Sequence, residues 1–356
     1  MSRPPVIDCE VLLGERPQDL VPYCDPPWRR ALEEPGDHHV PWSLKIQIFP
    51  RLGPQPSSTR AAHSPAELTD ILGARAVDAA LLLPGHMLKA GMVYTADYMS
   101  ALSRAYNRWL VETWLGGDVA AYGAVLALPH DPESSARDIE QFASHPRVRA
   151  VVVPTSNVDP LWGDRRYDPI YAAAESAGLP IVLRGMPGFM IPGSAHLVSP
   201  FASDFDQEPI GQSLMALAHL NRIVGTGLHA RFPRLKMLFL GAGITWLLHA
   251  TLRFDKEYLE TRRDVPWFKD RPSKILRERV WVGTGPIEGG ASPEAMADLI
   301  RISCGVNRVV YGSGWPQPHW DDVERLSGAL VDRKTRERVL GANAADLFGL
   351  DATATE

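Results

Sequence analysis

Short apolar runs recur along the chain, and each is followed by a turn and then by a segment with helical spacing. The runs are continuous and do not alternate between apolar and polar residues, which is typical of parallel strands that are buried on both faces. We therefore expect eight buried strands, at residues 6–9, 76–84, 119–129, 148–155, 180–185, 235–243, 280–286 and 308–314.

Helical patterns fill the segments between these strands. Asp131 before Pro132 and Ser292 before Pro293 are typical of a helix cap followed by the first turn. Eight strands that alternate with helices predict a (β/α)8 TIM barrel of the α/β class. A doubly wound sheet is the alternative, and we disfavour it because no GxGxxG turn follows the first strand. We expect the helices at residues 96–115, 132–144, 169–177, 211–229, 244–262 and 293–302.

The length of the chain fits one domain of this kind. It has 356 residues, of which 45% are hydrophobic, so it can bury a large core. We expect the barrel to span residues 1–350, with a Pro-rich insertion at about 22–65 after the first strand and a short tail at 351–356. We expect this insertion to be partly loop and partly a cover over the mouth of the barrel.

Charge and cysteine content exclude several classes of function. The chain has 37 Lys and Arg against 42 Asp and Glu, a net charge of −5, so it lacks the basic surface that nucleic acids or anionic membranes attract. The three cysteines are too few and too scattered for a disulfide framework or a zinc ribbon. Neither a signal peptide nor a membrane-spanning stretch is evident. We expect a cytoplasmic protein without nucleic-acid or membrane partners.

Five motifs, in this order, carry a family resemblance. They are GLPIVLRG at 178–185, RFPRLKMLFLGAGITWL at 231–247, RFDKEY at 253–258, RVWVGT at 279–284 and RVVYGSGWPQP at 308–318. With them the chain resembles the amidohydrolase superfamily, in particular the branch of aminocarboxymuconate-semialdehyde decarboxylase and related aromatic-acid decarboxylases. The resemblance covers nearly the whole chain. It implies an amidohydrolase-like TIM barrel, whose function resides at the carboxyl ends of the strands.

The resemblance also implies a divalent metal ion, held by side chains at the ends of strands one, five, six and eight. At the corresponding positions this sequence has Glu10 and Leu12 on strand one, Arg184 on strand five, Gly241 on strand six and Gly314 on strand eight. Only Glu10 offers a metal ligand, and Arg184 is a permanent cation. We therefore predict that the family metal site is absent and that the protein uses no metal or other cofactor.

Arg184 has two interpretations. Its planar guanidinium is suited to anchor the carboxylate of a substrate through two hydrogen bonds. Alternatively, it forms an ion pair with Glu10 that fills the vacated metal site, because a buried Arg without a partner is costly. Glu10, His319 and His196 are the candidate proton donors and acceptors, since the two histidines follow strands eight and five.

Apolar side chains near the same strand ends are candidates for substrate binding. We expect Met186, Phe189, Trp315 and Trp162 to line a pocket for a ring or a chain beside Arg184. The alternative is that they simply cover the barrel mouth. The histidines that we expect to serve only in packing lie on or beside helices: His219, His229 and His249.

Two functions follow from these observations. The first is a metal-independent enzyme that acts on a small organic or cyclic acid-like metabolite by proton chemistry of the lyase, hydrolase or cyclase type. The second is a catalytically inactive pseudoenzyme subunit that pairs with and supports an active amidohydrolase paralogue. We expect a small-molecule ligand and either a homodimer or a heteromer with such a paralogue, with residues 109–114 and 258–267 supplying apolar contact area.

Overall fold

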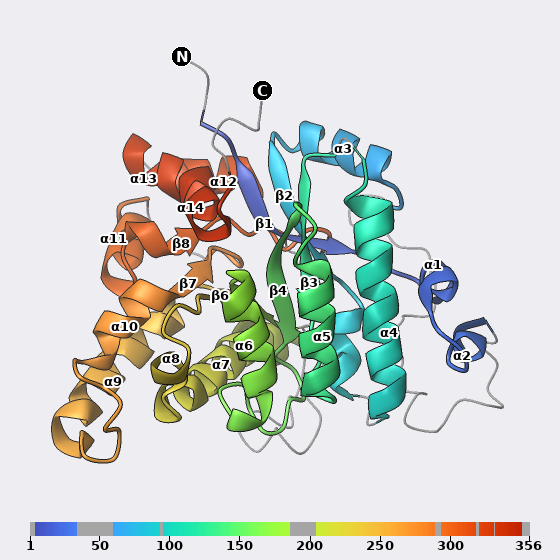
Figure 1. The fold of residues 1–356 in the computed structure, drawn as a ribbon. Helices are drawn as coiled ribbons and strands as arrows, with labels where there is room; N and C mark the ends of the chain where they lie inside the picture. Colours follow the sequence, from blue (N-terminus) through green and yellow to red (C-terminus); the bar gives the residue numbers. More distant parts are fainter. Residues whose placement is uncertain are drawn as a thin grey trace.

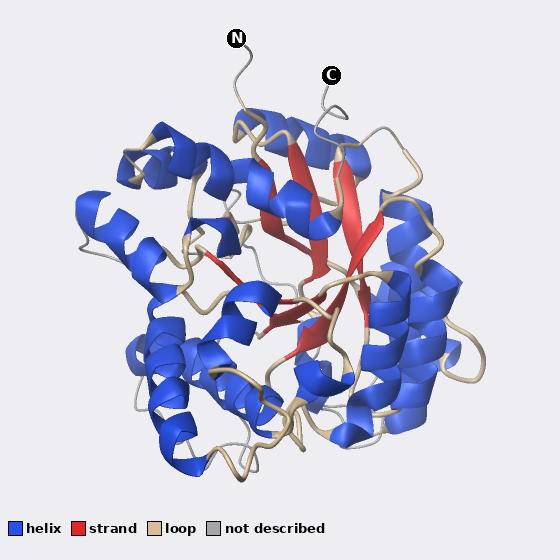
Figure 2. Ribbon diagram, turned by 60° about the vertical axis from the view of Figure 1, so that its left-hand side comes forward, coloured by secondary structure: helices blue, strands red, loops and turns tan. Residues whose placement is uncertain are grey.

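In the computed structural model, eight parallel strands pair in sequence order and curve into a barrel that the helices surround (Figure 2). The structure describes residues 4–33, 60–92, 95–117, 119–185, 204–288, 293–317, 320–330 and 332–350. The (β/α)8 prediction is confirmed. The strands are β1 (Ile7–Leu13), β2 (Ala79–Pro84), β3 (Ala121–Leu126), β4 (Val148–Pro154), β5 (Ile181–Arg184), β6 (Met237–Leu240), β7 (Val280–Gly283) and β8 (Val309–Val310).

Backbone hydrogen bonds join the first strand to the segment that follows the last one. The Cys9 amide donates to the Tyr311 carbonyl at 2.9 Å, and the Leu12 amide donates to the Trp315 carbonyl at 2.8 Å. Because these bonds bridge the remaining gap, the strand ring is closed and has no free edge there.

Fourteen α-helices appear in the described part of the chain, and most of them cover the outer face of the barrel (Figure 1). The Asp131 side chain accepts a hydrogen bond from the Ser134 amide at 3.0 Å, as its position before Pro132 predicts. The helices are α1 (Pro17–Leu20), α2 (Arg29–Glu33), α3 (Pro65–Ala74), α4 (Ala96–Trp109), α5 (Pro132–Phe142), α6 (Asp168–Ala177), α7 (Asp204–Gly225), α8 (Leu228–Arg231), α9 (Thr245–Thr261), α10 (Pro272–Arg279), α11 (Pro293–Ser303), α12 (Val323–Ala329), α13 (Arg333–Glu337) and α14 (Asn343–Phe348).

Two strand boundaries differ most from the prediction. Strand β1 continues to Leu13, past the apolar run at 6–9 and in line with the placement of Glu10 and Leu12 on strand one, because the barrel buries Glu10 with an ionic partner and the strand need not stop at a charge. Strand β8 has only two residues, whereas we expected it at 308–314. Downstream of it, Gly314 adopts φ +76°, a left-handed conformation that a strand cannot contain.

Two helix boundaries also differ. The helix expected at 211–229 begins at Asp204 and ends at Gly225, and α8 is a separate helix because Gly227 between them has φ +67°. The helix expected at 96–115 ends as α4 at Trp109, and the chain continues as a π-helical turn over Leu110–Trp114.

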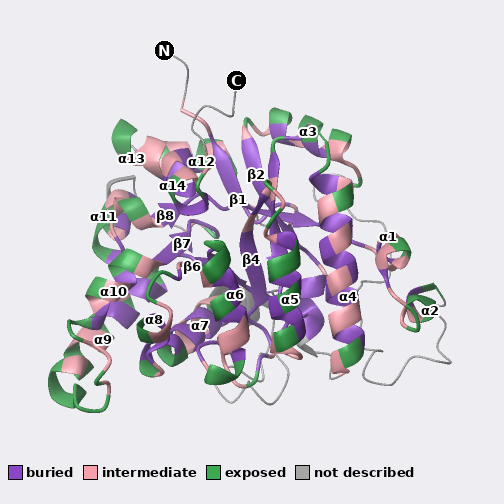
Figure 3. Ribbon diagram, in the orientation of Figure 1, coloured by how far each residue is buried: buried purple, intermediate pink, exposed green. Residues whose placement is uncertain are grey.

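The strands form the buried centre of the molecule (Figure 3). Every strand residue is buried except Tyr122 and Arg149, which are half-buried. This burial on both faces explains the continuous apolar runs in the sequence. Among the helices of the described part, none combines the length and the apolar character that crossing a membrane requires.

Most of the predicted Pro-rich insertion lies outside the described residues. The 3-10 turn Val21–Tyr23 and helix α2 belong to its first part, and residues 34–59 are not described. The expectation that this segment covers the mouth therefore stays a prediction, as does the tail at 351–356.

Candidate active site

Glu10 and Arg184 meet across the carboxyl ends of the strands. The Arg184 Nε donates to Glu10 Oε1 at 2.8 Å, and the two side chains are 2% and 1% exposed. In the ring of eight strands, β1 and β5 are separated by three strands on either side. The Arg184 side chain therefore crosses the barrel to reach Glu10. The structure contains the ion pair that was one of the two interpretations of Arg184.

The remaining nitrogens of Arg184 also have partners. Its Nη2 donates to Gln317 Oε1 at 2.9 Å, and its Nη1 donates to the carbonyl of the neighbouring Gly185. A guanidinium carries five N–H donors, so three are engaged within the described residues and two remain. Arg184 is thus a cation held at a defined position, with donors left for one further acceptor.

One glycine, Gly241, gives the guanidinium its space. A Cβ at Gly241 would lie 3.0 Å from Arg184 Cζ and 3.3 Å from Glu10 Oε1. A Cβ at Gly314 would lie 3.8 Å from Glu10 Oε1. Both glycines have positive φ, +71° and +76°. The close approach of the Arg184 guanidinium therefore requires a glycine at position 241, whereas a Cβ at Gly314 would make only ordinary contact with Glu10.

Burial dominates the electrostatics of Glu10. It raises the pKa of this carboxyl, while the charge and hydrogen bond of Arg184 oppose the shift, and Asp8 and Asp321 add to it. Glu10 Oε2 is buried and has no hydrogen-bond partner among the described residues. An orphaned carboxylate oxygen of this kind is costly, and such groups concentrate at functional sites.

The residues at this position do not fit a divalent metal ion. Within the described residues, no three side chains of the His, Cys, Asp or Glu type are placed to hold a metal. Glu10 is one carboxylate, Leu12 is apolar and buried, and the guanidinium of Arg184 lies beside Glu10 as a permanent cation. A metal ion at Glu10 would have to displace that cation.

Asp8 fixes the backbone at Glu10 and at the segment after β8 through hydrogen bonds of its carboxylate. Its Oδ1 accepts from the Glu10 amide at 3.1 Å and from the Ser313 amide at 2.9 Å, and its Oδ2 accepts from Arg75 Nη2 at 3.0 Å. These bonds tie β1 to the segment after β8. Neither Asp8 nor Gln317 is among the site residues predicted from the sequence. A charged residue inside an apolar run was the available signal for Asp8, whereas nothing local indicates the contact of Gln317.

The two tryptophans predicted to bind substrate are packed into the wall of the barrel. Trp162 is 1% exposed, and its indole Nε1 donates to the Pro154 carbonyl at 2.5 Å, with its ring 4.4 Å from that of Tyr167. Trp315 is buried, and the Arg75 guanidinium lies 5.7 Å from the centre of its ring. Their role in substrate binding stays a prediction.

The other predicted site residues lie outside the described part of the chain. These are His319, His196, Met186 and Phe189.

Among the histidines expected to serve in packing, His219 fits. Its Nδ1 accepts from the Trp162 amide at 3.1 Å, and its Nε2 donates to the Thr155 carbonyl at 2.9 Å. Burial lowers the pKa of His219 to about 4. His249 does not fit, because it lies on the solvent side of α9 and is exposed.

One of the two segments expected to supply an oligomer contact is used inside the chain. Trp109 and Trp114 are both buried, and their rings pack edge to face at 5.7 Å. Their apolar area is therefore not available to a partner, which corrects that expectation for residues 109–114. In the other segment, Tyr258 and Trp267 are half-buried.

A closed (β/α)8 barrel with charged side chains at the carboxyl ends of its strands defines the class of fold. A family model described as amidohydrolase matches residues 22–350, so the chain belongs to this family. No curated protein matches the chain.

Solved structures share the fold at low sequence identity. An amidohydrolase from Mycobacterium avium subsp. paratuberculosis K-10 is 18% identical, with a TM-score of 0.75 over 98% of this chain and 100% of that one. A 5-carboxyvanillate decarboxylase from Sphingomonas paucimobilis is 21% identical, with a TM-score of 0.69 over 98% and 100%. The 5-carboxyvanillate decarboxylase of Novosphingobium aromaticivorans, complexed with manganese and a nitrobenzoic acid, is 18% identical, with a TM-score of 0.71 over 97% and 96%.

Proposed function

We propose that the chain is a metal-independent enzyme of the amidohydrolase family that transfers a proton to or from a small organic acid at the mouth of the barrel. The observation that supports this most directly is the buried, unpartnered Oε2 of Glu10 beside the fixed cation of Arg184. A buried carboxylate oxygen without a hydrogen-bond partner destabilises the fold, so its presence favours a role in binding a ligand.

Arg184 takes the electrostatic role in this proposal. Its position across the barrel supplies a positive charge at the carboxyl ends of the strands, and two of its N–H donors remain for an acceptor on the substrate. A preorganised cation in a water-poor site stabilises negative charge that develops during a reaction far better than a cation in water does.

Glu10 takes the proton-transfer role. Because its pKa lies above the usual range for a carboxyl, it is a better proton donor near neutral pH than an exposed Glu. His319 and His196 stay candidates for a second proton donor or acceptor.

Two of the structural neighbours are 5-carboxyvanillate decarboxylases, which supports an aromatic carboxylic acid as the substrate class and decarboxylation as the first reaction to test. Protonated Glu10 gives its proton to the ring carbon that carries the carboxylate, and a C–H bond forms. The bond from that carbon to the carboxylate then breaks, its electron pair restores the ring, and CO2 leaves. Glu10 recovers a proton from water. The manganese bound in one of these neighbours has no counterpart in these steps, because the side chains around Glu10 do not fit a metal ion.

A pseudoenzyme subunit is the second candidate. It is favoured by the engagement of every Arg184 nitrogen with a partner from the chain itself, because such an arrangement stabilises the fold without any substrate. In this case the partner is an active paralogue, and the chain contributes a surface and no chemistry.

The test uses 5-carboxyvanillate in D2O with an excess of chelator. We expect CO2 release and deuterium incorporation that the chelator does not reduce. Glu10→Gln should lower the rate at least about 100-fold, the usual contribution of a general acid, whereas Glu112→Gln on the exposed surface of the chain should leave it unchanged. Loss of turnover on chelation would contradict the metal-independent reaction. No turnover, together with a stable complex with a paralogue, would establish the pseudoenzyme instead.

A further inference from the structure

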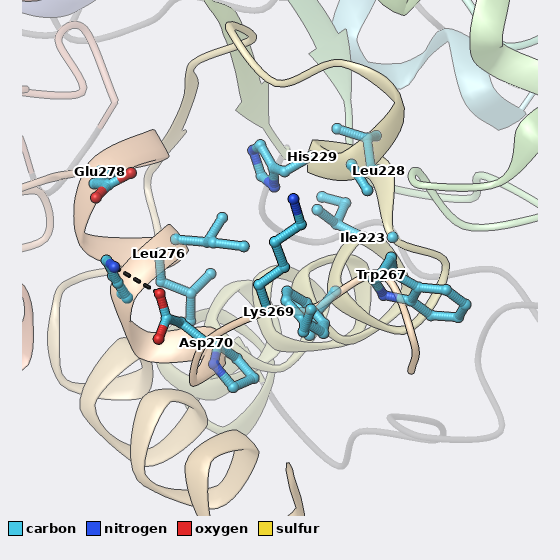
Figure 4. Close-up of a pocket in the computed structure, with 15 residues that line it drawn as sticks. Ile223, Leu228, His229, Trp267, Lys269, Asp270, Leu276 and Glu278 are labelled. Carbon is cyan, nitrogen blue, oxygen red and sulfur yellow. Dashed lines mark hydrogen bonds and ion pairs between the residues drawn. The ribbon is translucent and has the colours of Figure 1, made fainter. Parts of the chain in front are cut away.

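A cavity lies away from Glu10 and Arg184, between the end of α7, helix α8 and the loop that leads into α10 (Figure 4). Its volume is about 350 Å³, within the range of pockets that hold small molecules. Helices α8 and α10 lead into the amino ends of β6 and β7, whereas Arg184 stands at the carboxyl end of β5. The cavity therefore belongs to the end of the barrel opposite the candidate active site.

His229 in the wall of this cavity has an unmet hydrogen-bonding requirement. It is 8% exposed, and its Nε2 is buried without a hydrogen-bond partner among the described residues. Burial, with the nearby charge of Arg279, lowers the pKa of His229 to about 4 and keeps the imidazole neutral at physiological pH. A buried ring nitrogen without a hydrogen-bond partner is costly unless a bound molecule meets it.

Trp267 repeats this feature on the facing wall. Its indole Nε1 is also buried and unpartnered within the described part. The ring packs directly on Gly227, where a Cβ would lie only 2.7 Å from the indole. Because any side chain at position 227 would displace the ring, the glycine is what allows the indole to pack in this position.

The ammonium of Lys269 is directed toward the imidazole of His229 (Figure 4). No ion-pair partner of Lys269 is found among the described residues, whereas the other lysine of the cavity, Lys274, pairs with Asp270 at 2.6 Å. Figure 4 places Asp270 and Glu278 on the α10 side, away from Trp267. The cavity thus has the exposed ammonium of Lys269 on the His229 side and carboxylates on the α10 side.

The hydrogen-bonding groups of Lys269, Trp267 and His229 indicate the chemistry of the ligand. An ammonium and an indole N–H only donate hydrogen bonds, and a neutral imidazole adds one donor or one acceptor according to its tautomer. The polar end of a ligand must therefore accept hydrogen bonds. The rest of the wall is apolar, with Ile223, Val224, Leu228, Phe268 and Leu276 among the lining residues.

We propose that this cavity binds a small monocarboxylate with an apolar body, whose carboxylate accepts hydrogen bonds from Lys269 and Trp267 beside His229. The Lys269 ammonium supplies a positive charge beside His229, and the carboxylates of Asp270 and Glu278 on the α10 side disfavour a dianion such as phosphate more than a monoanion. The site is independent of the proposed reaction, because it lies at the other end of the barrel.

The experiment titrates benzoate into the full chain, with histidine labelled by ¹⁵N, and follows the imidazole signals by NMR. The signal that His229→Gln removes identifies His229. We expect benzoate to shift this signal, whereas benzyl alcohol, of the same shape without the charge, should shift it only at concentrations at least about tenfold higher. The loss of a hydrogen bond to a charged group has an effect of that size.

Matched variants separate this cavity from the active site. Lys269→Met and Trp267→Phe, which keeps the aromatic ring, should each weaken the benzoate effect at least about tenfold. Lys274→Met should leave it within about twofold, because the ammonium of Lys274 is already paired. A benzoate effect on His229 that survives both Lys269→Met and Trp267→Phe would overturn the proposal. So would binding of inorganic phosphate in preference to benzoate, or the absence of any shift of the His229 signal.

Discussion

Removal of the Arg184 guanidinium tests the physical account of the site. Arg184→Met keeps most of the length of the side chain and removes the charge, so it leaves the Glu10 carboxylate, 1% exposed, without its ionic partner. Breaking a buried ion pair in this way costs about 3 kcal/mol, because the surviving charge remains buried. For a chain of 356 residues, the unfolding entropy is about 0.7 kcal/mol per degree. The expected loss in Tm is therefore about 4 °C.

The loss of stability in Arg184→Met should also depend on pH. Arg184 lowers the pKa of Glu10 by its charge and by its hydrogen bond, so its removal raises that pKa still further. A carboxyl whose pKa is higher in the folded than in the unfolded state favours folding less and less as the pH rises above about 4.3. We therefore expect Arg184→Met to lose less unfolding free energy at about pH 5 than at about pH 8, because the stranded Glu10 takes up a proton more readily at the lower pH.

The assay is urea unfolding at both pH values for the wild type, Arg184→Met, Glu10→Gln and the double variant. The double variant should recover part of the loss, with a coupling energy of about 1–3 kcal/mol. Arg262→Met, at an exposed position, serves as the control and should change the unfolding free energy by less than about 0.5 kcal/mol. If Arg184→Met matched this control at pH 8, or if its effect were the same at both pH values, Arg184 would not be the partner that stabilises the Glu10 charge.

Three further predictions concern the same barrel. Gly241→Ala and Gly178→Ala introduce a Cβ at nearly equal φ, +71° and +69°, but only the Cβ at position 241 meets Arg184. Gly241→Ala should therefore lower the unfolding free energy, measured with denaturant, by at least about 1 kcal/mol more than Gly178→Ala does. Equal losses would contradict the close packing. His219, with its pKa lowered to about 4, is neutral in the fold and protonates more easily when unfolded. As the pH falls from about 6.5 to 4, the wild type should lose about 3 kcal/mol relative to His219→Gln, and parallel pH curves would refute this. Finally, about 1 mM Mn²⁺ should leave Tm unchanged, whereas a site with a Kd of about 10 µM would raise it by about 4 °C; elemental analysis of the purified protein is the independent check.

The sequence by itself determined the architecture and the family. Apolar runs of the length of buried strands, separated by helical segments, are local features, and the barrel follows from them because both faces of each strand must be covered. The same pattern located the carboxyl ends of the strands, and the family resemblance then indicated Glu10 and Arg184 as residues of one site. Element ends were less predictable. The strand around Glu10 continues because of a partner that is 174 positions away, and no window of the sequence contains both residues.

Only the tertiary structure decided which groups meet and which remain without partners. The closure of the barrel sets whether a side chain on β5 reaches β1, and the space at Gly241 admits the guanidinium. In the same way, Asp8 as the support of Glu10, and the cavity of His229 and Trp267, arise from elements that pack together after distant turns. Propensity and periodicity act over a few residues, whereas burial and hydrogen-bond satisfaction are properties of the assembled chain. For this reason the sequence indicated where the chemistry lies, and the packing determined which charges, donors and oxygens are available for it.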